Sequence, residues 1–283
     1  MFFPKGAVAV NPAFGSISLA TTDAQSFYNA LQISASMTAG RSLSLQGSYS
    51  FSKSVDDSSV GSTRNTGQYP LYRTLDRGLS DFSIRQRLVF NYFYTLPFGG
   101  GQAWLNNGVS SKIFGGWRLG GILTLRSGTP FTAEVNVRYR DYLFGATRPD
   151  LLPGTSNNPT NGVSAGCGRV AAGQQVGGPD LYFDPCAFSV PLPGTIGNVG
   201  RNTLISPSVY NMDVSLQREF LLDSKRRLQF RAEIFNVSNH PSFNSPSSVV
   251  FSGEAGGRPT TAGRITKTAT TSRQMQFALR LSF

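Results

Sequence analysis

Charged residues are scarce in this sequence. Asp, Glu, Lys and Arg make up only 14% of its 283 residues, whereas soluble domains carry roughly 25%. Hydrophobic residues reach only 39%, while 31 Gly and 21 Phe are present. Few charges, few aliphatic runs and many small polar and aromatic residues are typical of strands whose two faces meet different solvents.

Long apolar runs are also missing. No stretch reaches the roughly 18 apolar residues that suggest a transmembrane helix. Residues 1–6 (MFFPKG) lack the pattern of a secretory signal peptide, in which a charged segment precedes an apolar one. A chain whose strands face lipid must be exported, so we expect this one to be a portion of a longer precursor.

Residue patterns that carry chemistry are few. The only histidine, His240, has no Cys or carboxylate cluster beside it, which predicts a turn residue. Glycines 99–101 lack the Lys-Ser/Thr of a phosphate loop. Asp56 and Asp57 lack calcium-loop spacing and are interpreted as a solvated pair. The sequon at residues 236–238 is interpreted as a chance match. Because no acid–base or nucleophile constellation occurs, we expect no enzyme activity and no cofactor.

Only two cysteines occur, Cys167 and Cys186, and both lie in the longest predicted loop. In an oxidising exterior this separation favours a disulfide, which would stabilise the fold by roughly 3 kcal/mol. Two free thiols are the alternative. The CxxC spacing of many metal sites is absent.

The net charge of +11 would suit binding to nucleic acid. However, the 26 Lys and Arg are spread along the chain, and their densest group, residues 225–227, falls in a predicted tight turn. We therefore expect no nucleic-acid partner. Basic residues at the rim could instead meet anionic lipid head groups.

The pattern that is present has a period of two residues. In 273–283, five apolar residues (Met275, Phe277, Leu279, Leu281 and Phe283) alternate with polar or small ones, which gives a strand one apolar face. The same alternation predicts about seven strands, each near or above the roughly 9–11 residues that cross a bilayer. They are 26–38, 42–53, 81–95, 116–126, 208–219, 227–237 and 273–283.

Short and long connections alternate between these strands. Tight turns join two pairs, and 97–115 is a medium link, whereas long loops occupy 55–78, 128–206 and 239–272. Outer-membrane barrels have short periplasmic turns and long extracellular loops. The fold class predicted for 1–283 is therefore all-β, a partial antiparallel transmembrane β-barrel with Phe283 at the periplasmic side. An odd strand number implies further strands upstream.

Charged side chains fall on the polar face of these strands, which the barrel prediction directs toward the lumen. There they would pair with one another or with a plug, or line a channel with positive bias. They are Arg85, Arg87, Arg118, Arg126, Asp213, Arg231, Glu233 and Arg280.

The last strand, 274–283 (QMQFALRLSF), resembles the C-terminal signature of outer-membrane barrels, which alternates and ends in Phe. The resemblance implies that Phe277, Leu279, Leu281 and Phe283 are read by the barrel-assembly machinery.

A longer stretch, 230–244 (FRAEIFNVSNHPSFN), resembles the penultimate-strand motif of Oar-like TonB-dependent receptors. Segments 79–90 (LSDFSIRQRLVF) and 115–131 (GGWRLGGILTLRSGTPF) are similar to further parts of that barrel, as are 11–15 (NPAFG) and 49–56 (YSFSKSVD). The resemblance covers nearly the whole chain except about 141–200.

What this family implies is a barrel of about 22 strands with a plug, located in the bacterial outer membrane and energised by an inner-membrane complex that contacts the plug. Plug and signal peptide have no counterpart in this sequence. The expected function is binding of an unknown extracellular ligand by the long loops, followed by energised transport whose direction stays open. The alternative is a secreted adhesive or carbohydrate-binding β-sandwich, which the alternating connections and strand lengths disfavour.

Overall fold

The structure is a computed structural model that describes residues 22–59, 68, 73–136, 148–192, 195–223, 225–253 and 256–283. Segment 11–15 of the family resemblance lies outside these residues, as does much of the 55–78 loop. No helix in the described part of the chain is long and apolar enough to cross a membrane.

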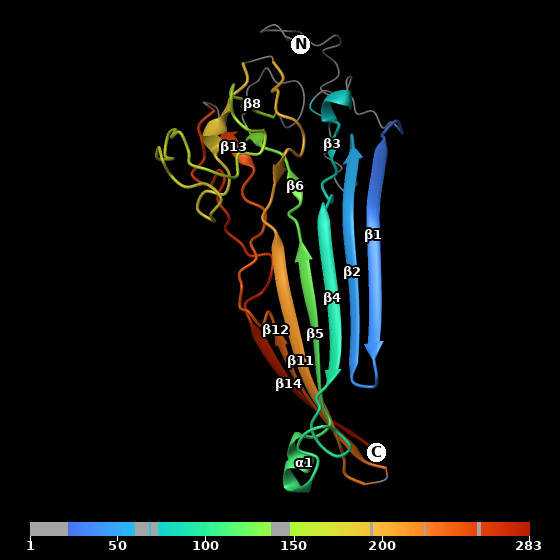
Figure 1. The fold of residues 1–283 in the computed structure, drawn as a ribbon. Helices are drawn as coiled ribbons and strands as arrows, with labels where there is room; N and C mark the ends of the chain where they lie inside the picture. Colours follow the sequence, from blue (N-terminus) through green and yellow to red (C-terminus); the bar gives the residue numbers. More distant parts are fainter. Residues whose placement is uncertain are drawn as a thin grey trace.

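Seven long strands form one antiparallel sheet, called the wall here, in which sequence neighbours are spatial neighbours (Figure 1). This confirms the predicted all-β antiparallel architecture. The wall is not closed, because the outer sides of its first and last strands pair with no described strand. In order, the strands are β1 (Ser26–Ala39), β2 (Leu43–Asp56), β4 (Gln86–Thr95), β5 (Trp117–Arg126), β11 (Val209–Leu221), β12 (Arg227–Phe235) and β14 (Gln274–Ser282).

The strand predicted over 81–95 begins only at Gln86, so its first five residues were predicted wrongly. Serines divert the chain here. The hydroxyl of Ser80 donates to that of Ser54 at 2.8 Å, and the amide of Ser83 donates to the carbonyl of Ser80 at 2.9 Å. These bonds form a turn beside β2, in which the short β3 (Gly78–Leu79) pairs with β2. The other predicted strands agree with the structure to within three residues.

Strand register aligns the two-residue alternation across the whole wall. One transverse row is apolar apart from a glycine, and the next row along is mainly polar. Because register and alternation agree, one face is apolar over all seven strands. The first row is Met37, Leu45, Tyr92, Gly121, Val214, Ile234 and Met275; the second is Thr38, Ser44, Phe93, Gly120, Ser215, Glu233 and Gln276.

Two glycines in β5 make room for aromatic rings of β4. A Cβ at Gly121 would approach the Tyr92 ring to 2.6 Å, and a Cβ at Gly120 would approach the Phe93 ring to 2.9 Å. Rings that lie over strand glycines supply the packing that the glycines lack.

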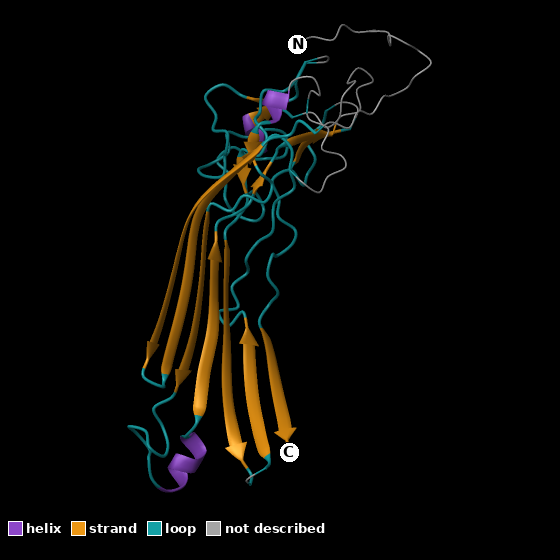
Figure 2. Cartoon of the chain, turned by 90° about the vertical axis from the view of Figure 1, so that its right-hand side faces the viewer, coloured by secondary structure: helices purple, strands orange, loops and turns teal. Residues whose placement is uncertain are grey.

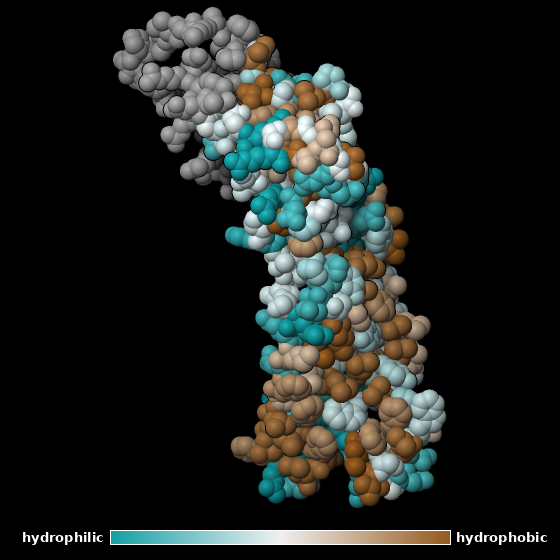
Figure 3. All heavy atoms as spheres, turned by 90° about the vertical axis from the view of Figure 1, so that its left-hand side faces the viewer, coloured by the Kyte–Doolittle hydropathy of each residue, from teal (hydrophilic) through white to brown (hydrophobic). Residues whose placement is uncertain are grey.

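The two ends of the wall differ. Tight turns and the short helix α1 (Gly108–Phe114) lie at the lower end, and the long loops gather at the upper end (Figures 1 and 2). We call the described parts of 128–208 and 236–273 the cap. Figure 3 shows hydrophobic side chains mainly over the lower part of one face and hydrophilic ones mainly above.

The cap has secondary structure and a core that the alternation did not predict. It contains η2 (Pro185–Ala187) and three two-stranded sheets: β6 (Pro130–Phe131) with β10 (Leu204–Ile205), β7 (Glu134–Asn136) with β13 (Val249–Ser252), and β8 (Asp150–Leu151) with β9 (Phe188–Ser189). Its buried core consists of Ala133, Val135, Phe183, Ala187, Phe188, Val199, Leu204, Val250 and Phe251.

Candidate functional site

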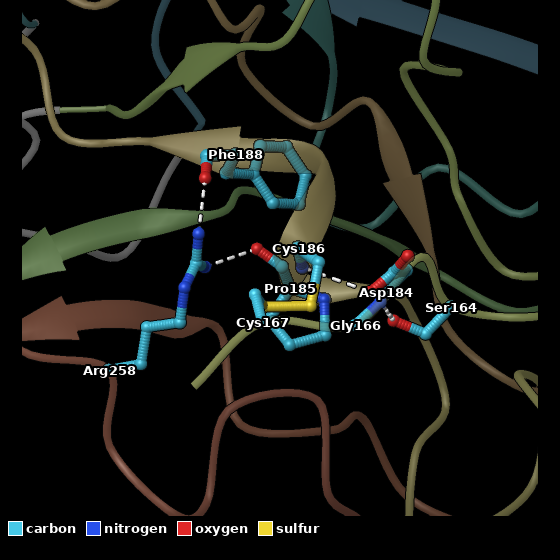
Figure 4. Close-up of a disulfide and its surroundings, with 8 residues drawn as sticks. All are labelled: Ser164, Gly166, Cys167, Asp184, Pro185, Cys186, Phe188 and Arg258. Atoms are coloured by element: carbon cyan, nitrogen blue, oxygen red, sulfur yellow. Dashed lines mark hydrogen bonds between the residues drawn. A yellow bond between two sulfur atoms is a disulfide. The ribbon is translucent and has the colours of Figure 1, made fainter. Parts of the chain in front are cut away.

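A disulfide joins Cys167 to Cys186 in the cap, with their Cα atoms 5.5 Å apart (Figure 4). Cys186 lies in the buried η2, whereas Cys167 belongs to a polar loop. Asp184 fixes both segments, since its carboxylate accepts from the hydroxyl of Ser164 and from the amide of Cys186, each at 2.9 Å. The bond thus anchors a surface loop to the cap core.

Arg258 attaches the long loop of residues 236–273 to the segment that contains Cys186. Its guanidinium donates to the carbonyl of Phe188 at 2.6 Å and to that of Pro185 (Figure 4). It also lies 4.4 Å from the ring centroid of Phe251. Burial lowers the pKa of Arg258, and the nearby charge of Asp184 opposes that shift. Both long loops are therefore held in one body.

A pocket of about 240 Å³ opens beside the disulfide. Among its lining residues are Arg169, Arg258 and Arg264, against the single carboxylate of Asp180, which Arg264 contacts at 3.4 Å. The excess of guanidinium groups favours an anionic or strongly polar ligand group. The volume of the pocket is below the roughly 300 Å³ at which small-molecule sites usually begin, so the pocket would hold only part of a ligand.

A buried ionic cluster joins the cap to the wall. Arg201, 8% exposed, forms an ion pair with Asp56 at the end of β2. It also donates to the carbonyl of Asp56 at 2.9 Å and to that of Asp76 at 2.8 Å. Asp56 is itself only 3% exposed. The solvated interpretation was therefore wrong for Asp56, because Arg201 reaches it from the far end of the longest loop.

A second ion pair lies beside the first. Arg148 donates to the carboxylate of Asp76 at 2.8 Å and to the carbonyl of Leu75 at 2.8 Å. Asp76 belongs to the 3-10 helix η1 (Arg73–Asp76). Burial lowers the pKa of Arg148, and Asp76 opposes this shift. The two-residue alternation of the strands does not predict either ion pair. The only signal available was that charges are so scarce in this chain that each carboxylate is a candidate partner.

The sequon asparagine also has a structural role. Asn236 is 2% exposed, and its Nδ2 donates to the carbonyls of His240 and Thr271 at 3.1 and 2.9 Å. His240 lies edge-on to the ring of Tyr210, with centroids 5.7 Å apart. These contacts fix the chain where β12 passes into the cap. In the described part of the chain, no group of three or more His, Cys, Asp or Glu could hold a metal ion.

Apart from Arg85, the predicted polar-face charges lie on five wall strands: β4, β5, β11, β12 and β14. Arg85 precedes β4, and its guanidinium lies 5.4 Å from the ring centroid of Phe51, a residue of the apolar face. Arg231 pairs with Glu233 at 3.3 Å. Asp213 accepts from the Asn211 side chain and from the Asn236 amide at 3.0 and 2.9 Å.

The remaining polar-face arginines are Arg87, Arg118, Arg126 and Arg280. Arg87 and Arg126 are directly opposite in register. Arg118 is opposite Gln217, and Arg280 is opposite Gln229. Among the residues that the structure describes, no carboxylate forms an ion pair with any of these arginines.

The residues of the predicted assembly signal share the apolar face of β14 and its end, which is an edge of the wall. Phe277, Leu279, Leu281 and Phe283 are 70%, 71%, 52% and 96% exposed. Their accessibility suits recognition by another protein, which stays a prediction.

A family profile described as an outer membrane beta barrel domain matches residues 4–276. Comparison with the curated proteins finds no match. The β-sandwich alternative was wrong, because the long strands form one sheet, and no second large sheet packs against it in the described residues. Such a barrel requires one apolar and one polar face, with short turns at one end and long loops at the other. The chain belongs to the outer membrane beta barrel domain family and is a protein of the bacterial outer membrane.

Proposed function

We propose that this barrel segment is part of a TonB-dependent receptor of the Oar-like kind, which binds an extracellular ligand and admits it by energised transport. The stretches that carry the resemblance support this proposal by their placement. Segments 79–90, 115–131 and 230–244 each span the boundary between a wall strand and the loops at the upper end of the wall. They are the junctions at which a binding cap would be held on a barrel.

One observation carries the proposal further: the polar face bears arginines that form no ion pair with a carboxylate of the described residues. Arg87 and Arg126 stand opposite each other, and like charges at such positions are destabilising. An acidic surface within the barrel would neutralise them. A plug that presents carboxylates fits this requirement. A water-filled channel is the competing interpretation, since hydrated guanidinium groups need no partner.

Conductance separates these two interpretations. The full-length protein would be reconstituted in planar bilayers and its conductance recorded before and after exposure to urea. A plugged transporter should conduct little until urea displaces the plug. A large steady conductance from the outset would overturn the plugged receptor and favour an open channel.

The proposed receptor has four kinds of partner. Lipid surrounds the apolar face, the barrel-assembly machinery reads β14, and an inner-membrane energy-coupling complex acts through a plug. The unknown ligand meets the cap first, where the pocket beside Arg169 and Arg264 would accept an anionic or polar group. The chain would act as a transport or surface component, not as an enzyme, and would need neither cofactor nor nucleic acid.

A further inference from the structure

The medium link 97–115 forms a compact knob at the lower end of the wall. The amide of Trp104 donates to the carbonyl of Pro97 at 3.0 Å, and the ring of Trp104 lies 5.9 Å from that of Phe98. The two ends of the link touch, because a Cβ on Gly99 would approach the Cα of Gly115 to 2.4 Å. Glycines at both positions thus allow the chain to close on itself, with α1 between them.

The knob exposes an apolar side. On α1, Val109 and Ile113 are one turn apart and 71% and 54% exposed. Further exposed apolar side chains are Trp104, Leu105 and Phe114. On the opposite side of α1, Ser110 and Ser111 are half-buried, and the hydroxyl of Ser110 donates to the carbonyl of Asn107 at 2.9 Å. Clustered exposed apolar residues of this kind usually mark an interaction surface.

Two side chains fix which side of the wall the knob lies on. Arg218 donates to the carbonyls of Lys112 and Ile113, and the indole of Trp117 donates to the carbonyl of Ile113 at 3.2 Å. Arg218 and Trp117 are directly opposite in register. By the two-residue alternation, Arg218 lies on the same face of β11 as Leu216 and Phe220, and Trp117 lies on the same face of β5 as Leu119. Both therefore project from the apolar face, and the knob is bound to that face.

The apolar face of an outer-membrane barrel meets lipid, so the exposed side of the knob continues an established lipid surface. We propose that the knob inserts its apolar side chains into the leaflet at the short-turn end of the barrel, at the boundary between head groups and acyl chains. Lys112 and Arg218 would then lie at the level of the lipid phosphates. Aromatic residues favour the same level, and short amphipathic helices bind there through buried apolar area.

Spin-label accessibility tests the depth of the knob. Val109→Cys and Ile113→Cys would be introduced into the full-length protein with the native disulfide intact. Each variant is labelled with a nitroxide and reconstituted in phosphatidylethanolamine–phosphatidylglycerol vesicles. The collision rate with oxygen, which concentrates in lipid, is compared with that of a water-soluble nickel chelate. Heat-dependent gel mobility first establishes that each variant is folded.

Two matched labels calibrate the result. Met37→Cys lies on the apolar face of β1 and reports lipid, whereas Arg41→Cys lies in the exposed β1–β2 turn at the same end and reports water. We expect oxygen-to-nickel ratios at both knob positions severalfold above that at Arg41→Cys, approaching the Met37→Cys value. Ratios equal to that of Arg41→Cys at either knob position would overturn the proposal, because the two residues share one side of α1.

Discussion

The wall and the cap of this protein are stabilised in different ways. The buried hydrophobic core lies in the cap, whereas the large apolar side chains of β1 and β14 are mostly exposed on the wall. The cap also contains the disulfide, and a buried arginine of the cap, Arg201, pairs with Asp56 at the end of wall strand β2. The wall depends on strand ladders and on lipid contact, as barrels in membranes do. Substitutions should therefore have effects that depend on the region.

The largest effect should follow from breaking the cap–wall ion pair. Replacing Arg201 by Met leaves the buried carboxylate of Asp56 without its cation, which typically costs about 3–5 kcal/mol. We expect the cap to become sensitive to limited proteolysis while the heat-dependent gel mobility of the barrel is retained. The double variant with Asp56→Leu should recover part of the resistance, because it removes the unpaired charge as well. Full resistance in the single variant would contradict the assigned role.

The wall should respond to the face that is changed. Leu279 lies on the apolar face of β14 beside Phe230, so Leu279→Arg should cost about 2–4 kcal/mol near the middle of the bilayer. Arg280→Gln, one residue along on the polar face, should cost much less. Unfolding by urea in lipid vesicles measures both. Equal losses of unfolding free energy at the two positions would contradict the assignment of faces.

The disulfide should matter for the cap alone. Replacing both Cys167 and Cys186 by Ser removes a crosslink across 19 residues. By the loop-entropy model this lowers the free energy of unfolding by about 3 kcal/mol. Hydrogen exchange should rise across the cap and stay unchanged in β4 and β5. Reduction of the unmodified protein should reproduce this pattern. Faster exchange in the wall strands would show that cap and wall are not separate units.

The smallest effect is expected at the junction between the two regions. Asn236→Ala leaves the carbonyls of His240 and Thr271 without their donor, at about 1–3 kcal/mol. Ser238→Ala removes only a 3.3 Å hydrogen bond to the Asn236 side chain and serves as the control. In thermal unfolding, the melting temperature should fall more for Asn236→Ala than for Ser238→Ala. The reverse order would mean that Asn236 is not the residue that fixes this turn.

Prediction from sequence succeeded where the physical constraint is local. The strand of residues 227–237 was located by its own alternation, and the structure places it at Arg227–Phe235. Prediction failed where side chains distant in sequence decide the structure. The hydrogen bond between Ser80 and Ser54 belongs to a turn that replaces the start of the strand predicted over 81–95, and the buried Asp56 pairs with Arg201, 145 residues away. The helix in the 97–115 link was missed because its seven residues are too few for a periodic signal.

The sequence by itself determined the wall: its strands, their two faces and the alternation of short and long connections. Those properties depend on a two-residue period, which each strand carries without reference to its neighbours. Only the tertiary structure decided the core of the cap, the partners of Arg148 and Arg201, and, at the other end of the wall, the face to which the 97–115 knob is bound. Those features depend on side chains that meet from separate segments of the chain, and no local pattern of residues encodes such contacts.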